Sequence, residues 1–534
     1  MQLVFYGADK EVTGSCHCLE ACGKKILIDC GLHQGEGTGV EDNRHLPFYP
    51  SQIDYVLITH AHIDHSGRLP LLIKDGYQGK IYATGATCDL LSIMLRDSAH
   101  IQMMDAVNAN RKGRRAGKEP LEPLYTVEDA EATAQHLVPC HYGEKITLCD
   151  GIQFRMTDAG HLLGSSSIEV WVTENGETQK IVFSGDIGNV NQPIIRDPQY
   201  LTEADYVVME STYGDREHEP IADYTPELAK VFDETLARGG NVVIPSFAVG
   251  RTQELLYYIR EMKEKRLVKS NPDFPVYVDS PLALEATKVY SDDLADYADD
   301  DTTHVIREGI RPLNFTNLHV CESTEESRVL NDDGVPKVII SSSGMCEAGR
   351  IRHHLKHNLW RPECSVVFVG FQAEGTLGRM LIDGVKQVKL FGELIAVQAQ
   401  IYNFKALSGH ADHTGLLRWI NSYTQKPKRV FIVHGEQLTA EGFGKELQQL
   451  GFNAYVPNFE AVADLSANTI VEEGVAPEKV HPHRGTGKGT TAFGRLIAAG
   501  QRLLHVIQHN EGGANKDLAR FTNQIISMCN KWDR

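Results

Sequence analysis

Short apolar runs rich in β-branched residues alternate with turns along the first part of the chain. Five such runs predict buried β-strands, at residues 25–29, 55–59, 168–172, 181–184 and 206–209. Residues 87–110 instead carry apolar positions at helical spacing, which predicts one long helix. We therefore expect this region to form a sheet-rich α/β domain.

A different rhythm begins at about residue 225, where helical and strand patterns alternate. Amphipathic helices are predicted at 225–238 and 252–265, and strands at 241–244, 276–278, 337–340 and 365–369. This alternation favours a mostly parallel sheet with helices on its faces. Strands and turns return over 388–404, before a helix at 413–422 and a strand at 429–433. After Pro477 and the glycine-rich stretch 485–489, amphipathic patterns at 493–508 and 515–531 predict two helices that make an oligomer or domain contact.

Composition indicates an ordinary globular protein, with 42% hydrophobic and 23% charged residues. No apolar run approaches the roughly 20 residues that cross a bilayer, and the N-terminal residues lack the pattern of a signal peptide. We expect a cytoplasmic protein without a membrane partner. The eleven Cys residues form no Cys-x-x-Cys pair, which favours free thiols over disulfides, and Cys16-His17-Cys18 fits the packing of a strand.

The net charge of −18 disfavours a protein that binds nucleic acid nonspecifically through a basic surface. It does not exclude a nuclease, because a metal site needs carboxylates and local basic patches can face a cleft. The basic run 111–118 is one such patch. It is either a solvated loop or a contact for an anionic substrate.

Four potential metal ligands fall within the six residues His60-Ala-His-Ile-Asp-His65. They follow the predicted strand 55–59, and open α/β sheets bind ligands at the carboxyl ends of their strands. Imidazole nitrogens and carboxylate oxygens are donors that zinc accepts. His60, His62, Asp64 and His65 are therefore candidate zinc ligands.

Three further candidates stand at other predicted strand ends. Asp29 closes the strand 25–29, Asp186 follows the strand 181–184, and His161 lies between Gly160 and Gly164 in a glycine-flanked loop. Each is a weak signal alone, since an Asp after a strand is usually a turn residue. Together with the His60–His65 stretch they would complete a site for two zinc ions.

This order of residues resembles that of the metallo-β-lactamase superfamily, in which an Asp, an H-x-H-x-D-H motif, a His and an Asp follow one another. The resemblance implies that His60, His62 and His161 bind one zinc ion and that Asp64 and His65 bind a second. Asp186 would bridge both ions, and Asp29 would orient a ligand histidine from behind.

Three later motifs resemble those of the β-CASP nucleases within this superfamily, at Glu210, His410 and His434. Segments around Arg251, Ser343-Gly344 and Arg379 are similar to further β-CASP segments, and these four residues are candidate substrate contacts. A histidine at position 434, an expected ligand of the second zinc, is typical of the RNA-cleaving branch. That branch includes ribonuclease J and the endonuclease subunit of the cleavage and polyadenylation machinery.

The resemblance implies an α/β fold, a metallo-β-lactamase αββα sandwich with an inserted β-CASP α/β domain. The sandwich would comprise residues 1–212 and be completed by 386–465, with the insert at 213–385 and a linker and helical tail at 466–534. The expected partner is single-stranded RNA, and a homodimer is possible.

The expected reaction is hydrolysis of an RNA phosphodiester by a hydroxide that two zinc ions activate, giving 5′-phosphate and 3′-hydroxyl ends. His410 would face the leaving oxygen as a proton donor, and Glu210 would hold its ring and raise its pKa. Two alternatives stay open: a small-molecule hydrolase of the thioesterase or lactonase type, and an inactive RNA-binding scaffold. Endonucleolytic and exonucleolytic cleavage are equally open.

Overall fold

The computed structural model describes residues 1–34, 43–114, 117, 119–218, 224–370, 372, 375–404, 408–476, 518, 521–522 and 524–526. The chain divides into two units, Met1–Gly474 and Val475–Arg534. The linker and the helix predicted at 493–508 lie outside the described residues. Of the helix predicted at 515–531, residues 518, 521–522 and 524–526 are described, and they are helical.

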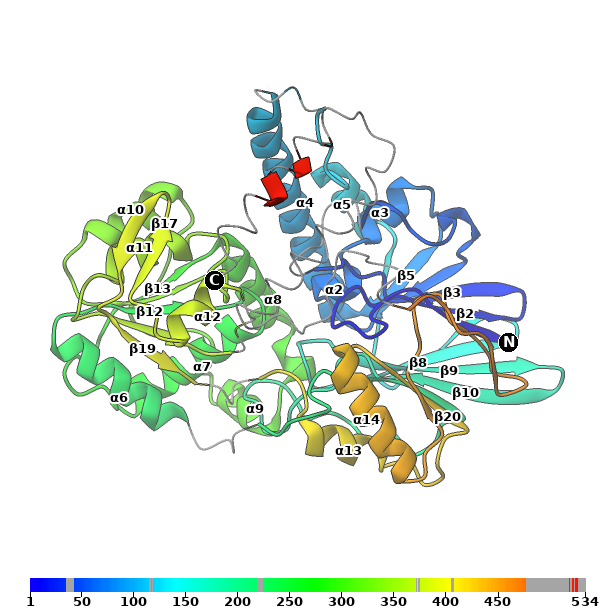
Figure 1. Ribbon diagram of the computed structural model, residues 1–534. Coiled ribbons are helices and arrows are strands. Elements are labelled where there is room, and N and C mark those ends of the chain that lie inside the picture. Colours follow the sequence, from blue (N-terminus) through cyan, green and yellow to red (C-terminus); the bar gives the residue numbers. More distant parts are fainter. Residues whose placement is uncertain are drawn as a thin grey trace. The chain divides into compact units, whose positions relative to one another are not determined.

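Two mixed sheets form one domain of the larger unit (Figure 1). One has the order β23-β22-β1-β2-β3-β4-β5-β6, in which β3, β4, β5 and β6 are parallel neighbours. Its strands are β1 Gln2–Phe5, β2 His17–Ala21, β3 Lys24–Ile28, β4 Tyr55–Leu57, β5 Lys80–Thr84, β6 Leu137–Cys140, β22 Val462–Asp464 and β23 Thr469–Glu472.

The other sheet has the order β21-β20-β11-β10-β9-β8-β7. Its strands are β7 Lys145–Cys149, β8 Ile152–Asp158, β9 Ser166–Glu174, β10 Glu177–Phe183, β11 Tyr206–Glu210, β20 Arg429–Val433 and β21 Ala454–Tyr455. The last two strands come from residues that follow the inserted domain. The sandwich is therefore completed by the returning chain.

Apolar side chains from the facing sides of the two sheets form one shared core, which includes Phe5, Ile28, Phe154, Phe183 and Phe431. Helices cover the outer faces of both sheets. On the first sheet these are α2 Ile63–Ser66, α3 Leu69–Lys74, α4 Gly85–Arg114 and α5 Val127–Ala134, and on the second α13 His413–Ile420 and α14 Gln437–Gln449. This arrangement confirms the predicted αββα sandwich.

The inserted domain contains a third sheet in which every described strand pair is parallel. Its order is β14-β13-β15-β12-β16-β19, with β12 Val242–Pro245, β13 Val276–Asp279, β14 Leu318–Val320, β15 Val338–Ser341, β16 Ser365–Phe368 and β19 Gln400–Asn403. The helices around it are α6 Tyr224–Ala237, α7 Arg251–Glu264, α8 Pro281–Tyr297, α9 Asp300–Arg307, α10 Thr324–Asp332, α11 Ile351–Asn358 and α12 Leu377–Ile382. A hairpin of β17 Gln387–Leu390 and β18 Glu393–Ala396 precedes the last strand.

The sixth strand of this sheet, β19, follows residue 385, the end of the inserted domain that the family resemblance implies. The strand pattern over 388–404 is present in the structure, but a local pattern cannot tell which sheet a strand joins. Only the pairing of β19 with β16 assigns it to the inserted domain.

The strands that lead to the candidate ligands all end at one edge of the sandwich. Strands β3 and β4 are parallel, as are β10, β11 and β20, and β8 runs in the same direction as β10 because both are antiparallel to β9. Gly185, just after β10, has φ +58°, and a Cβ there would lie 2.8 Å from the Cβ of Thr59. This glycine lets the two sheets approach closely beside the site.

No helix in the described part of the chain combines the length and apolar character that a membrane span requires. The ten cysteines in the described ranges are all unpaired, as predicted.

Candidate metal centre

The His60–His65 stretch begins in the loop after β4 and ends in a helix. His60 and His62 lie in the loop, whereas Asp64 and His65 belong to the one-turn helix α2. Asp64 occupies the first turn of α2 and His65 its last. The switch from loop to helix lets neighbouring residues face two different groups of ligands.

The first group contains His60, His62, His161 and Asp186. Nδ1 of His62 lies 3.1 Å from Nε2 of His60 and 3.2 Å from Nε2 of His161. Oδ2 of Asp186 lies 3.4 Å from the first of these Nε2 atoms and 3.5 Å from the second. Four ligands around a tetrahedral zinc ion at about 2.0–2.2 Å are separated by about 3.3–3.6 Å. The group therefore has the dimensions of a zinc site.

The second group contains Asp64, His65 and His434, with Asp186 beside it. Nε2 of His65 lies 3.2 Å from Nε2 of His434 and 3.2 Å from Oδ1 of Asp186. Oδ2 of Asp64 lies 3.5 Å from Nε2 of His434 and 4.0 Å from Nε2 of His65. Asp186 thus presents one oxygen to each group, which is the geometry of a bridging carboxylate.

Burial and charge set the protonation of both groups. Burial lowers the pKa of His60, His62 and His161 below the usual range, so these rings are neutral, the form that binds a metal. At Asp64 and Asp186 burial instead raises the pKa, but the facing imidazoles outweigh it. The pKa of Asp64 falls to about 2 and that of Asp186 lies well below its usual range.

A buried oxygen tests whether a metal fits these residues. Asp186 is only 2% exposed, and among the described residues its Oδ1 makes no well-aligned hydrogen bond, although Nε2 of His65 lies 3.2 Å away. A buried carboxylate oxygen without a donor is costly unless a cation binds it. The donor set of nitrogens and oxygens also suits zinc. The residues present therefore fit metal ions.

Asp29 lies behind the second group. Its Oδ2 is 2.8 Å from Nδ1 of His65 and accepts a hydrogen bond from Oγ1 of Thr59, while its Oδ1 accepts one from the backbone N–H of Thr59. Burial lowers the pKa of His65, but Asp186 and Asp29 outweigh it and raise that pKa well above its usual value. The contact between Asp29 and Nδ1 fixes the ring so that Nε2 faces the ligand group.

Glu210 and His410 form a pair at the edge of the centre. Nδ1 of His410 lies 3.2 Å from Oε2 of Glu210, and Nε2 of His410 lies 3.9 Å from Oδ2 of Asp186. Burial lowers the pKa of His410, but the charges of Glu210 and Asp186 outweigh it and raise the pKa to about 9. Asp186, Glu210 and His410 also lie close enough to be a third ligand group. However, Glu210 already accepts hydrogen bonds from Ile187 N (2.5 Å) and Thr212 Oγ1 (2.5 Å).

Sequence motifs did not single out three groups that hold these side chains in place. Oγ1 of Thr212 donates a hydrogen bond to Glu210 and lies 3.0 Å from Nδ1 of His434. Thr212 therefore connects Glu210 with His434. The carbonyl oxygen of Gly409 lies 3.0 Å from Nδ1 of His161. Thr59 holds Asp29 as described above. Thr59 directly precedes the motif residue His60, and Thr212 lies two residues after Glu210, so sequence proximity could have suggested both. A backbone carbonyl such as that of Gly409 leaves no signal in the sequence.

The four candidate substrate contacts lie in the inserted domain. Arg251 is 9% exposed and pairs with Glu254, so another residue already occupies its guanidinium. Arg379 is more open and pairs with Asp383 one turn later, at 3.0 Å. Ser343 and Gly344 follow β15 at the carboxyl edge of the parallel sheet, where such sheets bind ligands.

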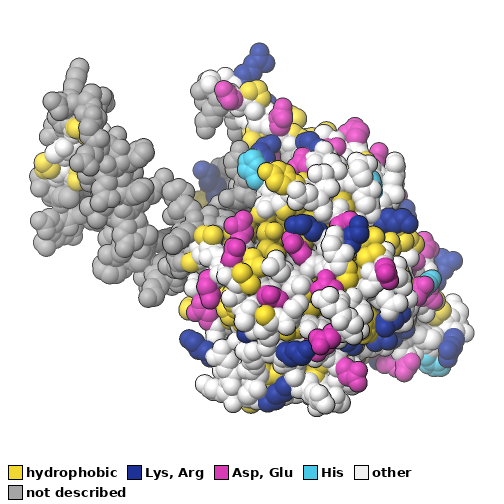
Figure 2. All heavy atoms as spheres, turned by 90° about the vertical axis from the view of Figure 1, so that its right-hand side faces the viewer, with side chains coloured by type: hydrophobic (Ala, Val, Ile, Leu, Met, Phe, Trp, Pro, Cys, Tyr) yellow, Lys and Arg dark blue, Asp and Glu magenta, His cyan; other side chains and the backbone are white. Residues whose placement is uncertain are grey.

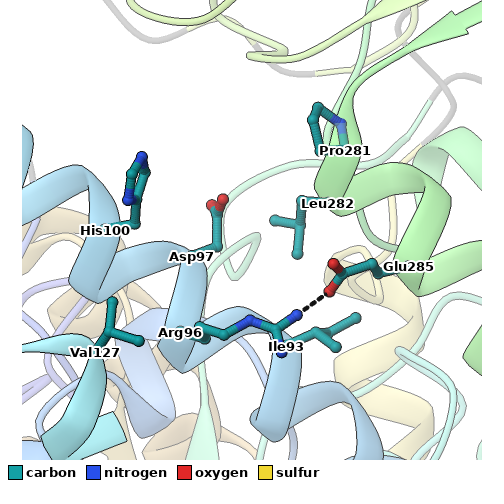
Figure 3. Close-up of a pocket in the computed structure, with 8 residues that line it drawn as sticks. All are labelled: Ile93, Arg96, Asp97, His100, Val127, Pro281, Leu282 and Glu285. Carbon is teal, nitrogen blue, oxygen red and sulfur yellow. Dashed lines mark hydrogen bonds and ion pairs between the residues drawn. The ribbon is translucent and has the colours of Figure 1, made fainter. Parts of the chain in front are cut away.

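One hollow of the larger unit lies apart from the centre. It has a volume of about 270 Å³ between α4, α5 and α8, and none of the candidate ligands lines it (Figure 3). Figure 3 shows Arg96 of α4 reaching Glu285 of α8, an ion pair between the sandwich and the inserted domain. This hollow marks the contact between the two domains.

The surface charge is mixed. On the face drawn in Figure 2, Lys and Arg side chains alternate with Asp and Glu side chains, without a large area of one sign. Of the basic run 111–118, Arg111 and Arg114 are exposed at the end of α4, and residues 115, 116 and 118 lie outside the described part. Its role stays open.

Three family models match the chain. Residues 18–206 match a metallo-beta-lactamase superfamily domain, residues 252–381 a Beta-Casp domain, and residues 394–457 a Zn-dependent metallo-hydrolase RNA specificity domain.

Whole-chain comparisons agree with these models. Ribonuclease TTHA0252 from Thermus thermophilus is 38% identical over 461 residues, which cover 86% of this chain and 99% of that protein. An RNase J-like protein from Methanocaldococcus jannaschii is 30% identical, over 85% and 97% of the two chains. Transcription termination factor FttA from the same organism is 30% identical, over 86% and 71%. A crystal structure of a protein of unknown function from Enterococcus faecalis shares the fold, with TM-score 0.50 and 12% identity over 88% of this chain and 99% of that one.

Proposed function

Since the chain belongs to the β-CASP ribonucleases of the metallo-β-lactamase superfamily, metal-dependent hydrolases that act on RNA, we propose that it cleaves single-stranded RNA at a two-zinc centre. The products carry 5′-phosphate and 3′-hydroxyl ends. The observation that supports this most strongly is the position of Asp186, with one carboxylate oxygen beside each of two ligand groups.

His60, His62 and His161 would hold one zinc ion, and Asp64, His65 and His434 would hold the other, with Asp186 beside both groups. Two bound zinc ions supply a water of lowered pKa and neutralise charge on the phosphate oxygens. The protein fixes these ligands from behind through Asp29 and the carbonyl of Gly409. Such supporting contacts keep each ring in the orientation and tautomer that ligation needs.

His410 moves the proton that the leaving oxygen requires. With Nδ1 directed at Glu210, its Nε2 faces the centre 3.9 Å from Asp186. The charge of Glu210 raises the pKa of His410 and so favours the protonated ring, which can donate a proton to the departing 3′ oxygen. Glu210 is 1% exposed and is held by Ile187 and Thr212, so it acts as a positioning residue for His410.

The test is a cleavage assay on labelled single-stranded RNA after EDTA treatment and again after zinc is restored. We expect cleavage to stop and then return, and the new 5′ ends to carry phosphate. Asp64→Asn should abolish turnover, whereas Asp75→Asn, an exposed position after α3, should not. Failure on RNA combined with zinc-dependent hydrolysis of a thioester or lactone contradicts the proposal. A product ladder from a 5′-labelled, structured RNA separates endonucleolytic from exonucleolytic cleavage.

A further inference from the structure

An exposed aromatic ring stands at the carboxyl edge of the parallel sheet in the inserted domain. Phe247 follows β12 and exposes 47% of its surface, whereas Ser246 and Val249 beside it are buried. A single exposed apolar side chain is ordinary on a protein surface. The surroundings of Phe247 are what distinguish it.

The backbone of Phe247 is fixed by hydrogen bonds to its carbonyl oxygen. That oxygen accepts from Thr252 Oγ1 at 2.7 Å, from Thr252 N at 3.3 Å and from Ser246 Oγ at 3.2 Å. A ring on a fixed backbone loses little conformational freedom when it binds a partner. Phe247 is therefore exposed without being loosely held.

The ring of Phe247 lies against Gly344, one of the candidate substrate contacts. A Cβ at position 344 would come within 3.1 Å of two ring atoms, closer than an ordinary contact. The carbonyl of Gly344 in turn accepts a hydrogen bond from Gln372 Nε2 at 3.0 Å, which holds the loop. The glycine permits the ring to rest on the backbone of this loop.

The segment that carries Phe247 also abuts a ligand loop of the metal centre. Gly250, three residues later, has φ +82°, and a Cβ there would lie 3.1 Å from Cδ1 of Leu162. Leu162 directly follows the candidate zinc ligand His161. The segment that carries the exposed ring therefore borders a ligand loop of the centre.

We propose that the Phe247 ring is a stacking platform for one base of the RNA, a nucleotide close to the scissile bond. Exposed aromatic rings stack on the bases of single strands, and this contact accepts any base because every base has a π-face. The platform would set the position of the strand without selecting its sequence. This inference rests on the proposed ribonuclease function.

The experiment combines Phe247→Ala with RNA substrates in which a single base is replaced by an abasic ribose, moved one position at a time around the cleavage site. One stacked base contributes about 1–3 kcal/mol by alanine substitution, which corresponds to about 5- to 150-fold in kcat/KM. We expect the intact enzyme to lose this factor at one abasic position. Phe247→Ala should show the same reduction in kcat/KM on intact RNA. It should show no further reduction on the RNA that is abasic at that position.

Phe247→Tyr retains the ring and should restore the wild-type pattern. Phe391→Ala is the matched control, because Phe391 is 50% exposed in the same domain, at the turn between β17 and β18, and stacks on His353 instead. Zinc content and the unfolding midpoint are measured for every variant. The stacking role is supported if all variants have equal zinc content and stability and the abasic substrates give the expected pattern of losses. It is overturned if Phe247→Ala loses zinc or stability and Phe247→Tyr does not restore them.

Equal abasic profiles for the wild type and Phe247→Ala overturn the stacking role while leaving the ribonuclease function intact. A loss at the same position in Phe391→Ala also overturns it. A zinc-loaded wild type that cleaves no RNA at all overturns both proposals, so the two failures are distinguishable.

Discussion

Nδ1 of His410 lies 3.2 Å from Oε2 of Glu210, although the two residues are 200 positions apart in the chain. Glu210 ends β11 before the inserted domain begins, and His410 follows that domain. A bridge between Gly188 and His410 and a hydrogen bond from Ala411 N to Ile187 O bring the returning chain to the site. The completed sandwich, rather than either segment alone, creates this pair.

Glu210→Gln removes one of the charges that raise the pKa of His410. If protonated His410 is the acid, kcat falls as pH rises through its pKa, because the ring then loses its proton. The variant should therefore lose activity at a lower pH than the wild type, with a loss at pH 8 of up to about 10²-fold. A kcat profile from pH 6 to 10 measures this.

Glu217→Gln is the matched control, since Glu217 faces a different imidazole, that of His413, at 3.3 Å. It should leave the profile unchanged. If kcat fell at the same alkaline pH in Glu210→Gln and the wild type, His410 would not be the acid.

His410→Ala should separate proton transfer from metal binding. We expect two zinc ions per chain to be retained, because the first and second ligand groups do not include His410, while kcat falls by about 10²–10⁴-fold. His434→Ala should instead lose one of the two ions. Metal analysis by mass spectrometry, together with single-turnover cleavage, compares them. If His410→Ala lost a zinc ion, His410 would be a metal ligand and not only a proton donor.

Asp29→Asn should weaken the second zinc ion without removing a ligand. The variant replaces the acceptor that faces Nδ1 of His65 at 2.8 Å, and such supporting contacts are worth about 10- to 100-fold in metal affinity. Competition with a chelator measures the loss. Asp54→Asn, which instead changes a pair with Lys24, should bind zinc as the wild type does. Equal affinities for Asp29→Asn and the wild type would refute a positioning role for Asp29.

Asp279→Asn tests the interior of the inserted domain. Asp279 is fully buried and accepts hydrogen bonds from Arg350 (2.7 Å), His354 (2.6 Å) and Ser327 (2.5 Å). Removing one charge from a buried pair destabilises a protein by about 3–5 kcal/mol, and urea unfolding followed by circular dichroism should show about 3 kcal/mol. Asp273→Asn, at an exposed position, should change little. An unchanged midpoint in Asp279→Asn would show that this charge does not stabilise the domain.

The pH dependence of that contribution has a definite sign. Burial raises the pKa of Asp279, but the three donors outweigh it and hold the pKa below its usual value of 3.8. The stabilisation is therefore present at neutral pH and is lost as the pH falls below about 4. Wild type and Asp279→Asn should converge in stability under acid conditions.

The sequence identifies candidate ligands because their residue types and order carry the chemistry. His60, His62, Asp64 and His65 are adjacent in the chain, and Asp29, His161 and Asp186 follow recognisable strand ends. What it cannot supply is distance. That Asp186 faces both ligand groups follows from the packing of two sheets, which no local pattern encodes.

The helices of the inserted domain were harder to predict than its strands. Helices α8, α9 and α10 were not predicted, yet α10 begins with a capping box in which Ser323 and Glu326 exchange hydrogen bonds. That signal was available in the sequence. No comparable signal in the sequence indicates the buried ion pair between Arg251 and Glu254. The local sequence around an arginine is the same whether its side chain faces substrate or a neighbouring helix turn.

Titration of the metal-free protein with zinc, while cleavage of a labelled single-stranded RNA is followed, tests the two-metal centre most directly. The account predicts that activity stays low through the first equivalent, rises with the second and then reaches a plateau, and that His434→Ala never rises. Full activity at one equivalent per chain, or no RNA cleavage at any zinc content, would contradict it.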